Sequence, residues 1–179
     1  MKKIIILTSI ILSSCSSSKI IYNPAPQILP QHIKTIAVRP FLNKSSIFGM
    51  EEKLTLKIID EFIRDARYPI KKESEADGVI AGEIKSYIMI PIQYDANMVP
   101  TTYKITLNYS IKMIDRAKNI VLWEENTLVA NYIFSDSSLP GGMTEEQARE
   151  RLWEIIARDT VKRTVEGFGS VTGVSTKKL

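Results

Sequence analysis

Hydrophobic and polar residues alternate most regularly between Thr102 and Asp115. Every second position holds a large apolar side chain: Tyr103, Ile105, Leu107, Tyr109, Ile111 and Met113. The positions between them are polar: Thr102, Lys104, Thr106, Asn108, Ser110 and Lys112. A period of two is typical of a strand with one face on a core. We therefore predict a strand whose second face meets something polar.

Three further stretches have the composition of strands. The first runs from Ile33 to Phe41 and ends around Pro40. The second runs from Val79 to Ile92 after an Asp-Gly turn, and its isoleucines at positions 80, 84, 88 and 90 share one parity. The last runs from Ile120 to Phe134, where the alternation changes phase around Glu124 and Glu125. That change predicts a β-bulge.

Two stretches have helical periodicity instead. Apolar residues recur at three- and four-residue steps from Met50 to Ala66: Leu54, Ile58, Ile59, Phe62 and Ile63. A second helix is expected from Thr144 to about Val165. Thr144 and Gln147 fit a capping box at its start, and Gly167 and Gly169 follow its end.

The order of elements predicts an α+β fold, a two-layer α/β sandwich in the order β-α-β-β-β-α. Two helices would cover one face of a four-stranded mixed sheet. The helical crossover predicts that the first two strands run parallel, and the short turns predict antiparallel neighbours elsewhere. The second sheet face is left for a partner or for solvent.

The first fifteen residues have the layout of a secretory signal. Lys2 and Lys3 precede the apolar run from Ile4 to Leu12, which is too short to span a bilayer. Leu12-Ser13-Ser14-Cys15 resembles a bacterial lipobox, so Cys15 would become the acylated first residue; the alternative is a plain signal with an incidental cysteine. We expect a signal peptide at 1–14, a flexible tether at 15–32, a domain at 33–167 and a disordered tail at 168–179.

Composition argues against most catalytic classes. His32 is the only histidine and Cys15 the only cysteine, so no Ser-His-Asp triad, no His/Cys metal cluster and no internal disulfide is expected. No glycine-rich phosphate loop or cofactor motif is present. Without the signal, 22 Lys and Arg face 20 Asp and Glu, a balance that does not indicate nucleic-acid binding. We therefore expect no catalytic residues, no metal and no cofactor.

Several of these stretches resemble one family. Residues Ile33 to Asn43, Ala76 to Tyr87, Tyr103 to Asp115 and Asn119 to Glu124 resemble strands of the LptE family of lipopolysaccharide-assembly lipoproteins. The resemblance implies four strands, two helices and no catalysis. It also implies a partner, an outer-membrane β-barrel of the LptD type, which the lipoprotein plugs and helps to assemble, with lipopolysaccharide as a further contact. Ser16, not an aspartate, follows Cys15. By resemblance to the lipoprotein sorting rule of enteric bacteria, this implies a lipid-anchored, periplasm-facing position at the outer membrane.

The polar side of the strand at 102–115 is the expected contact surface. Lys104, Thr106, Ser110 and Lys112 are its candidate residues, since a polar barrel lumen needs polar partners and lysines can meet lipid phosphates. The alternative is that the two lysines lie on a sheet face that contacts only solvent. A second functional hypothesis is a periplasmic lipoprotein that regulates a cell-wall synthase or serves as an auxiliary subunit of a lipid transporter.

Overall fold

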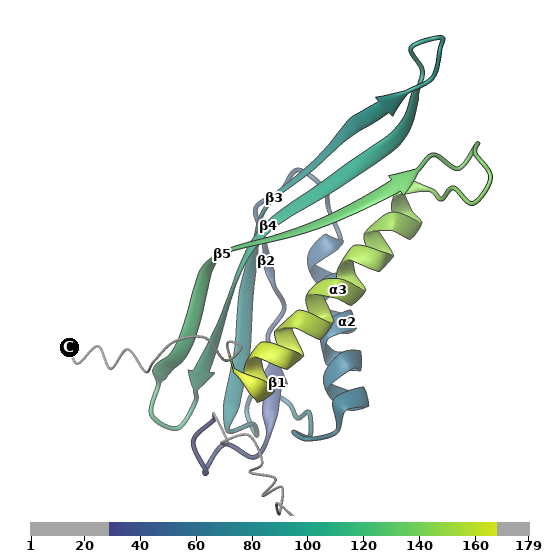
Figure 1. The fold of residues 1–179 in the computed structure, drawn as a ribbon. Helices are drawn as coiled ribbons and strands as arrows, with labels where there is room; N and C mark the ends of the chain where they lie inside the picture. Colours follow the sequence, from purple (N-terminus) through teal and green to yellow (C-terminus); the bar gives the residue numbers. More distant parts are fainter. Residues whose placement is uncertain (1–28, 168–179) are drawn as a thin grey trace, which may run out of the picture.

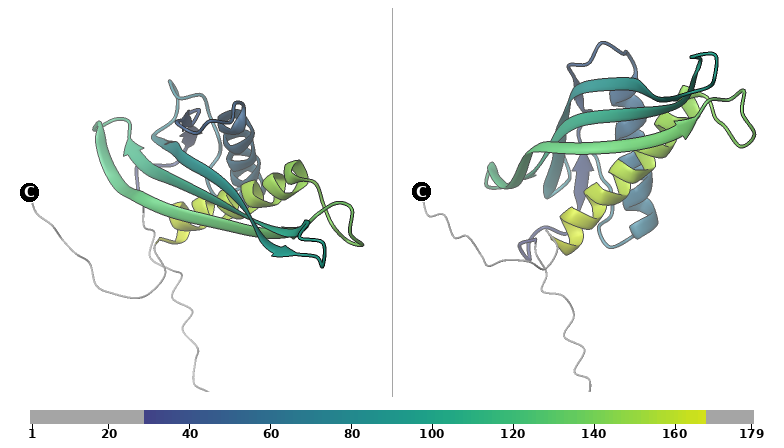
Figure 2. Two further views of the ribbon diagram at one scale, coloured as in Figure 1. Left: turned by 90° about the horizontal axis from the view of Figure 1, so that it is seen from above. Right: turned by 45° about the horizontal axis from the view of Figure 1, so that its top comes forward.

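The computed structural model describes residues 29–167, which form one sheet covered on one side by two helices (Figure 1). The elements are β1 (Ile36–Val38), β2 (Leu42–Asn43), α2 (Met50–Asp65), β3 (Gly78–Tyr94), β4 (Pro100–Asp115), β5 (Ile120–Ser135) and α3 (Glu145–Glu166). This arrangement confirms the predicted two-layer α+β fold. Figure 2 shows both helices on the same side of the twisted sheet.

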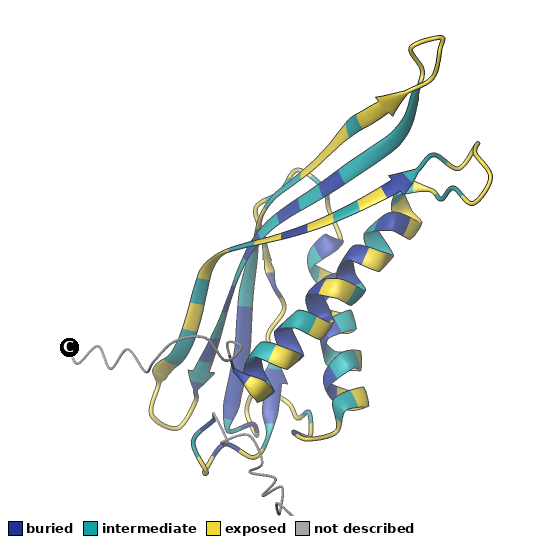
Figure 3. Ribbon diagram, in the orientation of Figure 1, coloured by how far each residue is buried: buried dark blue, intermediate teal, exposed yellow. Residues whose placement is uncertain are grey.

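The strand order is β1-β3-β4-β5, with β2 also pairing with β3. β1 and β2 run parallel to β3, while β3, β4 and β5 are antiparallel neighbours. The predicted directions are therefore confirmed. The core lies between the sheet and the helices and includes Leu54, Ile58, Leu107, Ile111 and Trp153. Figure 3 marks the buried positions of the ribbon in dark blue.

The prediction of a single first strand between Ile33 and Phe41 is wrong in detail. The structure has two short strands there, separated around Pro40, which has no N–H to donate to a ladder. Phe41 turns inward instead: its N–H donates to Thr55 Oγ1 of α2 at 3.1 Å, and its ring lies over Gly82. A Cβ at position 82 would overlap that ring, so glycine is required by close packing.

The prediction that the isoleucines at positions 80, 84, 88 and 90 share one face of β3 is also wrong beyond the middle of the strand. Ile84 pairs with Tyr109, but Ser86 pairs with the adjacent Asn108, so Lys85 is an extra residue in a β-bulge. The bulge reverses the faces from Ser86 to Pro91, after which the register shifts again. Ile88 and Ile90 point away from the core that holds Ile80 and Ile84.

Helix ends and the predicted bulge in β5 agree with the sequence. Thr144 and Gln147 form the reciprocal capping box, and Gly167 caps α3. The β5 register shifts between the pairs Tyr109–Leu128 and Ile111–Glu125. Along α2, Leu54, Ile58 and Phe62 are buried, whereas Ile63, which we placed on the same stripe, is exposed. Its position on the helix turns it away from the sheet.

The end of the expected tether packs on the domain. Leu29 is buried in the core, and the N–H of Ile33 donates to the carbonyl of Pro30 at 2.9 Å. His32 bonds to Asp115 of β4. The described structure therefore includes four residues before the domain boundary expected from the sequence. The signal, Cys15, the rest of the tether and the tail lie outside the described residues.

Candidate interaction surface

The sheet face opposite the helices is left uncovered by the fold. The four candidate residues Lys104, Thr106, Ser110 and Lys112 all lie on it, because β4 alternates strictly and buries Ile105, Leu107, Tyr109, Ile111 and Met113 on the other side. We call this surface the outer face. Cys15, the expected lipidation residue, lies outside the described residues.

Polar groups along the centre of the outer face bond to one another. Thr106 Oγ1 donates to Asn131 Oδ1 of β5 at 2.8 Å, and Asn108 Nδ2 donates to Ser86 Oγ of β3 at 2.7 Å. These bonds join all three long strands, so the side chains are held in place before any partner arrives. A preformed surface loses less side-chain entropy on binding.

Isoleucines and a valine flank this polar centre. Ile88 is opposite Thr106, Ile90 is opposite Lys104 on β3, and Ile133 is opposite Lys104 on β5. Their exposed fractions are 49%, 47% and 57%, and Val129 on β5 is exposed at 54%. The upper part of the outer face is thus a mixed surface in which Lys104 lies between two isoleucines. Such contiguous exposed apolar side chains are typical of a contact surface.

The apolar part of the outer face was not predicted from the sequence, although the sequence contains a pattern that indicates it. From Tyr87 to Ile92 every residue is apolar, so neither parity is polar. Such a run indicates a strand covered on both faces. The bulge decides which residues face outward, and it depends on the pairing of β3 with β4 rather than on β3 alone.

The lower part of the outer face is a charged hollow of about 380 Å³. Ser110 and Lys112 line it with Arg39, Glu83 and Glu124, among other residues. Its charges are largely engaged: Lys44 Nζ lies 3.0 Å from Glu83 Oε2, and Arg39 forms a bidentate pair with Glu73. The side-chain hydrogen bond to Glu73 raises the pKa of Arg39 against the opposing effect of burial. Ser110 and Lys112 therefore belong to a different environment from Lys104 and Thr106.

The hairpin between β3 and β4 extends beyond the helices (Figure 1). Asp95 organises its turn: its Oδ1 accepts hydrogen bonds from the N–H groups of Asn97 and Val99, both at 2.8 Å. Met98 has a positive φ of 63° and a side chain that is 75% exposed. The exposed side chains of Tyr94, Met98 and Val99 make this tip apolar.

Tyr87 connects β3 to the start of α3. Its hydroxyl donates to Glu145 Oε1 at 2.9 Å. Burial raises the pKa of Tyr87, and the Glu145 carboxylate raises it further. The hydroxyl thus stays protonated and fixes the base of the extending hairpin against the helical layer.

In residues 29–167 no group of three or more His, Cys, Asp or Glu side chains could hold a metal ion. Within the same range, neither helix is long and apolar enough to cross a bilayer. The chemistry that the outer face can perform is recognition, through hydroxyls, amides, lysines and aliphatic groups.

Two solved structures share this fold at low sequence identity, and a third resembles it more weakly. XCC0632 from Xanthomonas campestris is 12% identical, with a TM-score of 0.53, covering 79% of this chain and 88% of that chain. The protein CT253 from Chlamydia trachomatis is 12% identical, with a TM-score of 0.51, covering 72% and 94%. Lipoprotein GNA1162 from Neisseria meningitidis is 13% identical, with a TM-score of 0.43, covering 72% and 96%. Among curated proteins, no sequence matches this chain.

The family comparison covers nearly the whole described domain. The model of the lipopolysaccharide-assembly family LptE matches residues 33–164, from the turn before β1 to the last turns of α3. This range contains every strand, all of α2, nearly all of α3 and the outer face. The chain therefore belongs to the LptE family, a non-catalytic lipoprotein family of lipopolysaccharide assembly.

Proposed function

We propose that this protein plugs and helps to assemble the β-barrel through which lipopolysaccharide reaches the outer leaflet. Membership of the LptE family places the chain in lipopolysaccharide assembly. The single observation that supports plugging is the uncovered outer face, which combines an internally bonded polar centre with exposed isoleucines. A sheet face that contacts only solvent would not need exposed isoleucines beside polar groups that bond to one another.

The dimensions of the sheet suit a lumen. β4 has 16 residues, which at about 3.4 Å per residue gives roughly 54 Å, longer than the ~30 Å hydrocarbon core of a bilayer. A two-layer domain needs a wide barrel, and the largest single-chain barrels enclose plugs. The proposed partner is therefore a large barrel of the LptD type, entered along the long axis of the sheet.

Because the outer face is mixed, a barrel wall in contact with it must provide both hydrogen-bonding groups and apolar side chains. A polar lumen would satisfy Thr106, Asn108 and Asn131, which are the hydrogen-bonding groups of the centre. The flanking isoleucines need apolar side chains from the wall or from loops that fold into the lumen. Lys104, on the upper part, and Lys112, in the lower hollow, are the residues proposed to meet lipopolysaccharide phosphates.

In-cell photo-crosslinking tests the proposal. A photoreactive residue at Thr106, Ser110 or Ile133, or in the loop 135–142, should trap one large outer-membrane barrel protein. The same residue at Ile105 should trap nothing large, because Ile105 is fully buried under the helices. A cell-wall synthase or an inner-membrane transporter subunit in the trapped band would instead favour the alternative function. Depletion of the protein should lower the amount of folded barrel.

A further inference from the structure

Three loop segments meet at the end of the domain opposite the extended hairpin. They are residues 29–36, 66–78 and 115–119. The N–H of Lys71 donates to the Ile36 carbonyl at 2.9 Å, and the N–H of Arg116 donates to the Asp77 carbonyl at 2.9 Å. Asp77 Oδ2 also accepts from the N–H groups of Lys34 and Thr35. We call these joined segments the tether pole, since the chain before Leu29 leaves from it.

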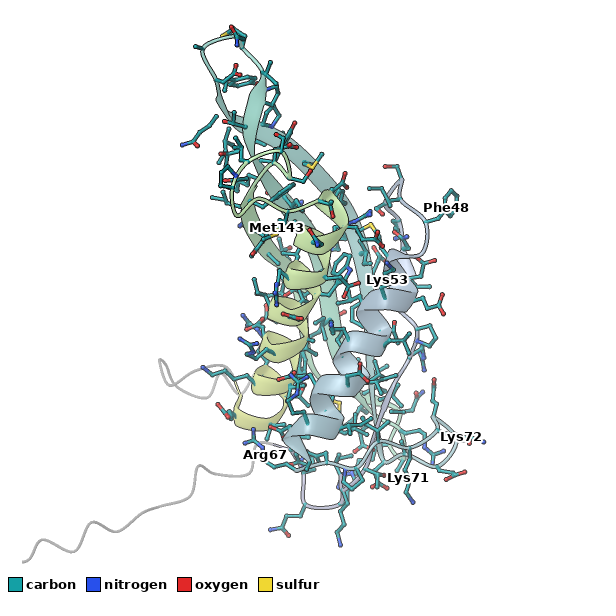
Figure 4. The ribbon with its side chains drawn as sticks, turned by 90° about the vertical axis from the view of Figure 1, so that its right-hand side faces the viewer. Phe48, Lys53, Arg67, Lys71, Lys72 and Met143 are labelled. Carbon is teal, nitrogen blue, oxygen red and sulfur yellow. The ribbon has the colours of Figure 1, made fainter. Side chains whose placement is uncertain are left out.

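The tether pole carries exposed cations. Lys34, Lys71, Lys72, Arg116 and Lys118 are all exposed. None of these five side chains forms an ion pair within residues 29–167. Arg67, Lys71 and Lys72 are labelled near the lower end of the molecule in Figure 4, well below Phe48, Lys53 and Met143.

Most acidic groups of the tether pole are engaged internally. Asp115 is fully buried and bonds to His32, Asp77 accepts three hydrogen bonds from Lys34 and Thr35, and Glu73 pairs with Arg39. Glu75 alone is an exposed carboxylate without such a bond in the described structure. Over the three segments, six Lys and Arg face four Asp and Glu, while the rest of the described residues hold 13 against 16. Arg67, one of the six, pairs with Asp65 and Glu166 outside these segments, so the positive excess of the tether pole rests on its five exposed cations that form no ion pair in the described structure. These five cations place the positive end of the domain at the tether pole.

The chain outside the structure adds to this polarity. Residues 15–28 join the pole at Leu29 and contain Lys19, while residues 168–179 follow Gly167 and contain Lys177 and Lys178. Gly167 follows Glu166, whose carboxylate lies 3.3 Å from Arg67 of the pole. Both flanking segments thus begin at the positive end, and neither contains Asp or Glu. If Cys15 carries the lipid anchor, its 14-residue connection keeps the pole within about 50 Å of the membrane.

We propose that the tether pole docks on the anionic phospholipid headgroups of the membrane that holds the anchor. Basic residues within a Debye length of an anionic surface each strengthen membrane binding about five-fold at low salt. While the domain is tethered but not inside a barrel, the contact would direct the long axis of the sheet away from that membrane, with the hairpin tip farthest from it. The lipid contact and this orientation therefore belong to the barrel-free protein, and they do not depend on the identity of its partner.

Vesicle sedimentation of residues 16–179 tests the charge requirement. In 50 mM salt the protein should bind vesicles of phosphatidylcholine with about a third phosphatidylglycerol at least ten-fold better than pure phosphatidylcholine. Lys71→Gln with Lys72→Gln should weaken that binding about 25-fold. The charge-matched control, Lys44→Gln with Lys53→Gln, removes two cations distant from the pole and should change it less than two-fold. Thermal melts verify that both double variants fold.

Two results would overturn the proposal. Equal losses for the two double variants would mean that net charge alone, rather than the tether pole, drives binding. Equal binding to both vesicle types, unaffected by 0.5 M salt, would mean that apolar side chains such as those of the hairpin tip carry it.

Headgroup quenching tests the orientation directly. The acylated protein has no free thiol once Cys15 is modified, so a fluorophore can be attached at Ser74→Cys in the pole or Asn97→Cys at the hairpin tip. A quencher on the lipid headgroups should quench the label at position 74 at least three-fold more than the label at position 97. Equal or reversed quenching contradicts the proposed orientation.

Discussion

His32 Nε2 lies 2.7 Å from Asp115 Oδ2, across 83 residues of sequence. Asp115 ends β4 and is fully buried, and its second oxygen accepts the N–H of Lys118 at 3.1 Å. The pair ties the segment before β1 to the turn between β4 and β5. It thereby positions the point where the N-terminal chain leaves the domain.

Asp115 should make stability depend on acid pH. Burial alone would raise its pKa, but the hydrogen bonds from Lys118 and His32 outweigh burial and lower the pKa. A folded-state pKa below the unfolded value of about 3.9 means that the contribution is complete above that pH and is lost as pH falls through the folded pKa. Asp115→Asn should lower Tm at pH 7 and flatten its fall below pH 4. Glu75→Gln, an exposed control, should do neither, and equal melts for both variants would contradict this role.

Leu107 should contribute strongly to the core. It is fully buried on the inner side of β4, so Leu107→Ala should cost about 2–5 kcal/mol through lost contacts and a residual cavity. Lys112→Ala, on the outer face of the same strand, should cost less than about 0.5 kcal/mol. Urea unfolding of both variants measures the difference. Comparable losses would mean that the two faces of β4 are assigned wrongly.

Ile88 and Ile133 should matter for assembly rather than for stability. Both are about half exposed on the outer face, so Ile88→Asn with Ile133→Asn should shift the free energy of unfolding by less than about 1 kcal/mol. In cells the same variant should reduce co-purification of the barrel several-fold, because its polar side chains no longer match an apolar contact. Ile63→Asn, exposed on α2, is the matched control and should leave co-purification unchanged. A full yield of barrel with the double variant would argue against a contact at this face.

Cys15 should be the point of lipid attachment. Cys15→Ser should abolish labelling with a fatty-acid probe, because no other thiol exists in the chain. The variant should either accumulate with its signal uncut or be released from the membrane fraction. A variant that still labels and sediments with membranes would show that the lipobox interpretation is wrong.

The local sequence alone determined where strands and helices lie, and which of their faces is buried, wherever the pattern depends on a single strand or helix. The alternation from Tyr103 to Met113 predicted the buried side of β4, and the Thr144–Gln147 capping box located the start of α3. The family could also be recognised from the sequence, because the stretches that resemble the LptE family lie within the residues that the family model matches. These features depend on residues close in sequence, whose geometry follows from backbone periodicity.

Tertiary structure decided what depends on pairing between distant segments. The bulge at Lys85 arises from the register of β3 on β4, and it alone turns Ile88 and Ile90 outward. The sequence does not reveal that His32 meets Asp115, or that Phe41 needs glycine at position 82. The mixed outer face and the basic tether pole are likewise assembled from separate strands and loops. A one-residue change of register reverses every side chain after it, so only the assembled sheet defines these surfaces.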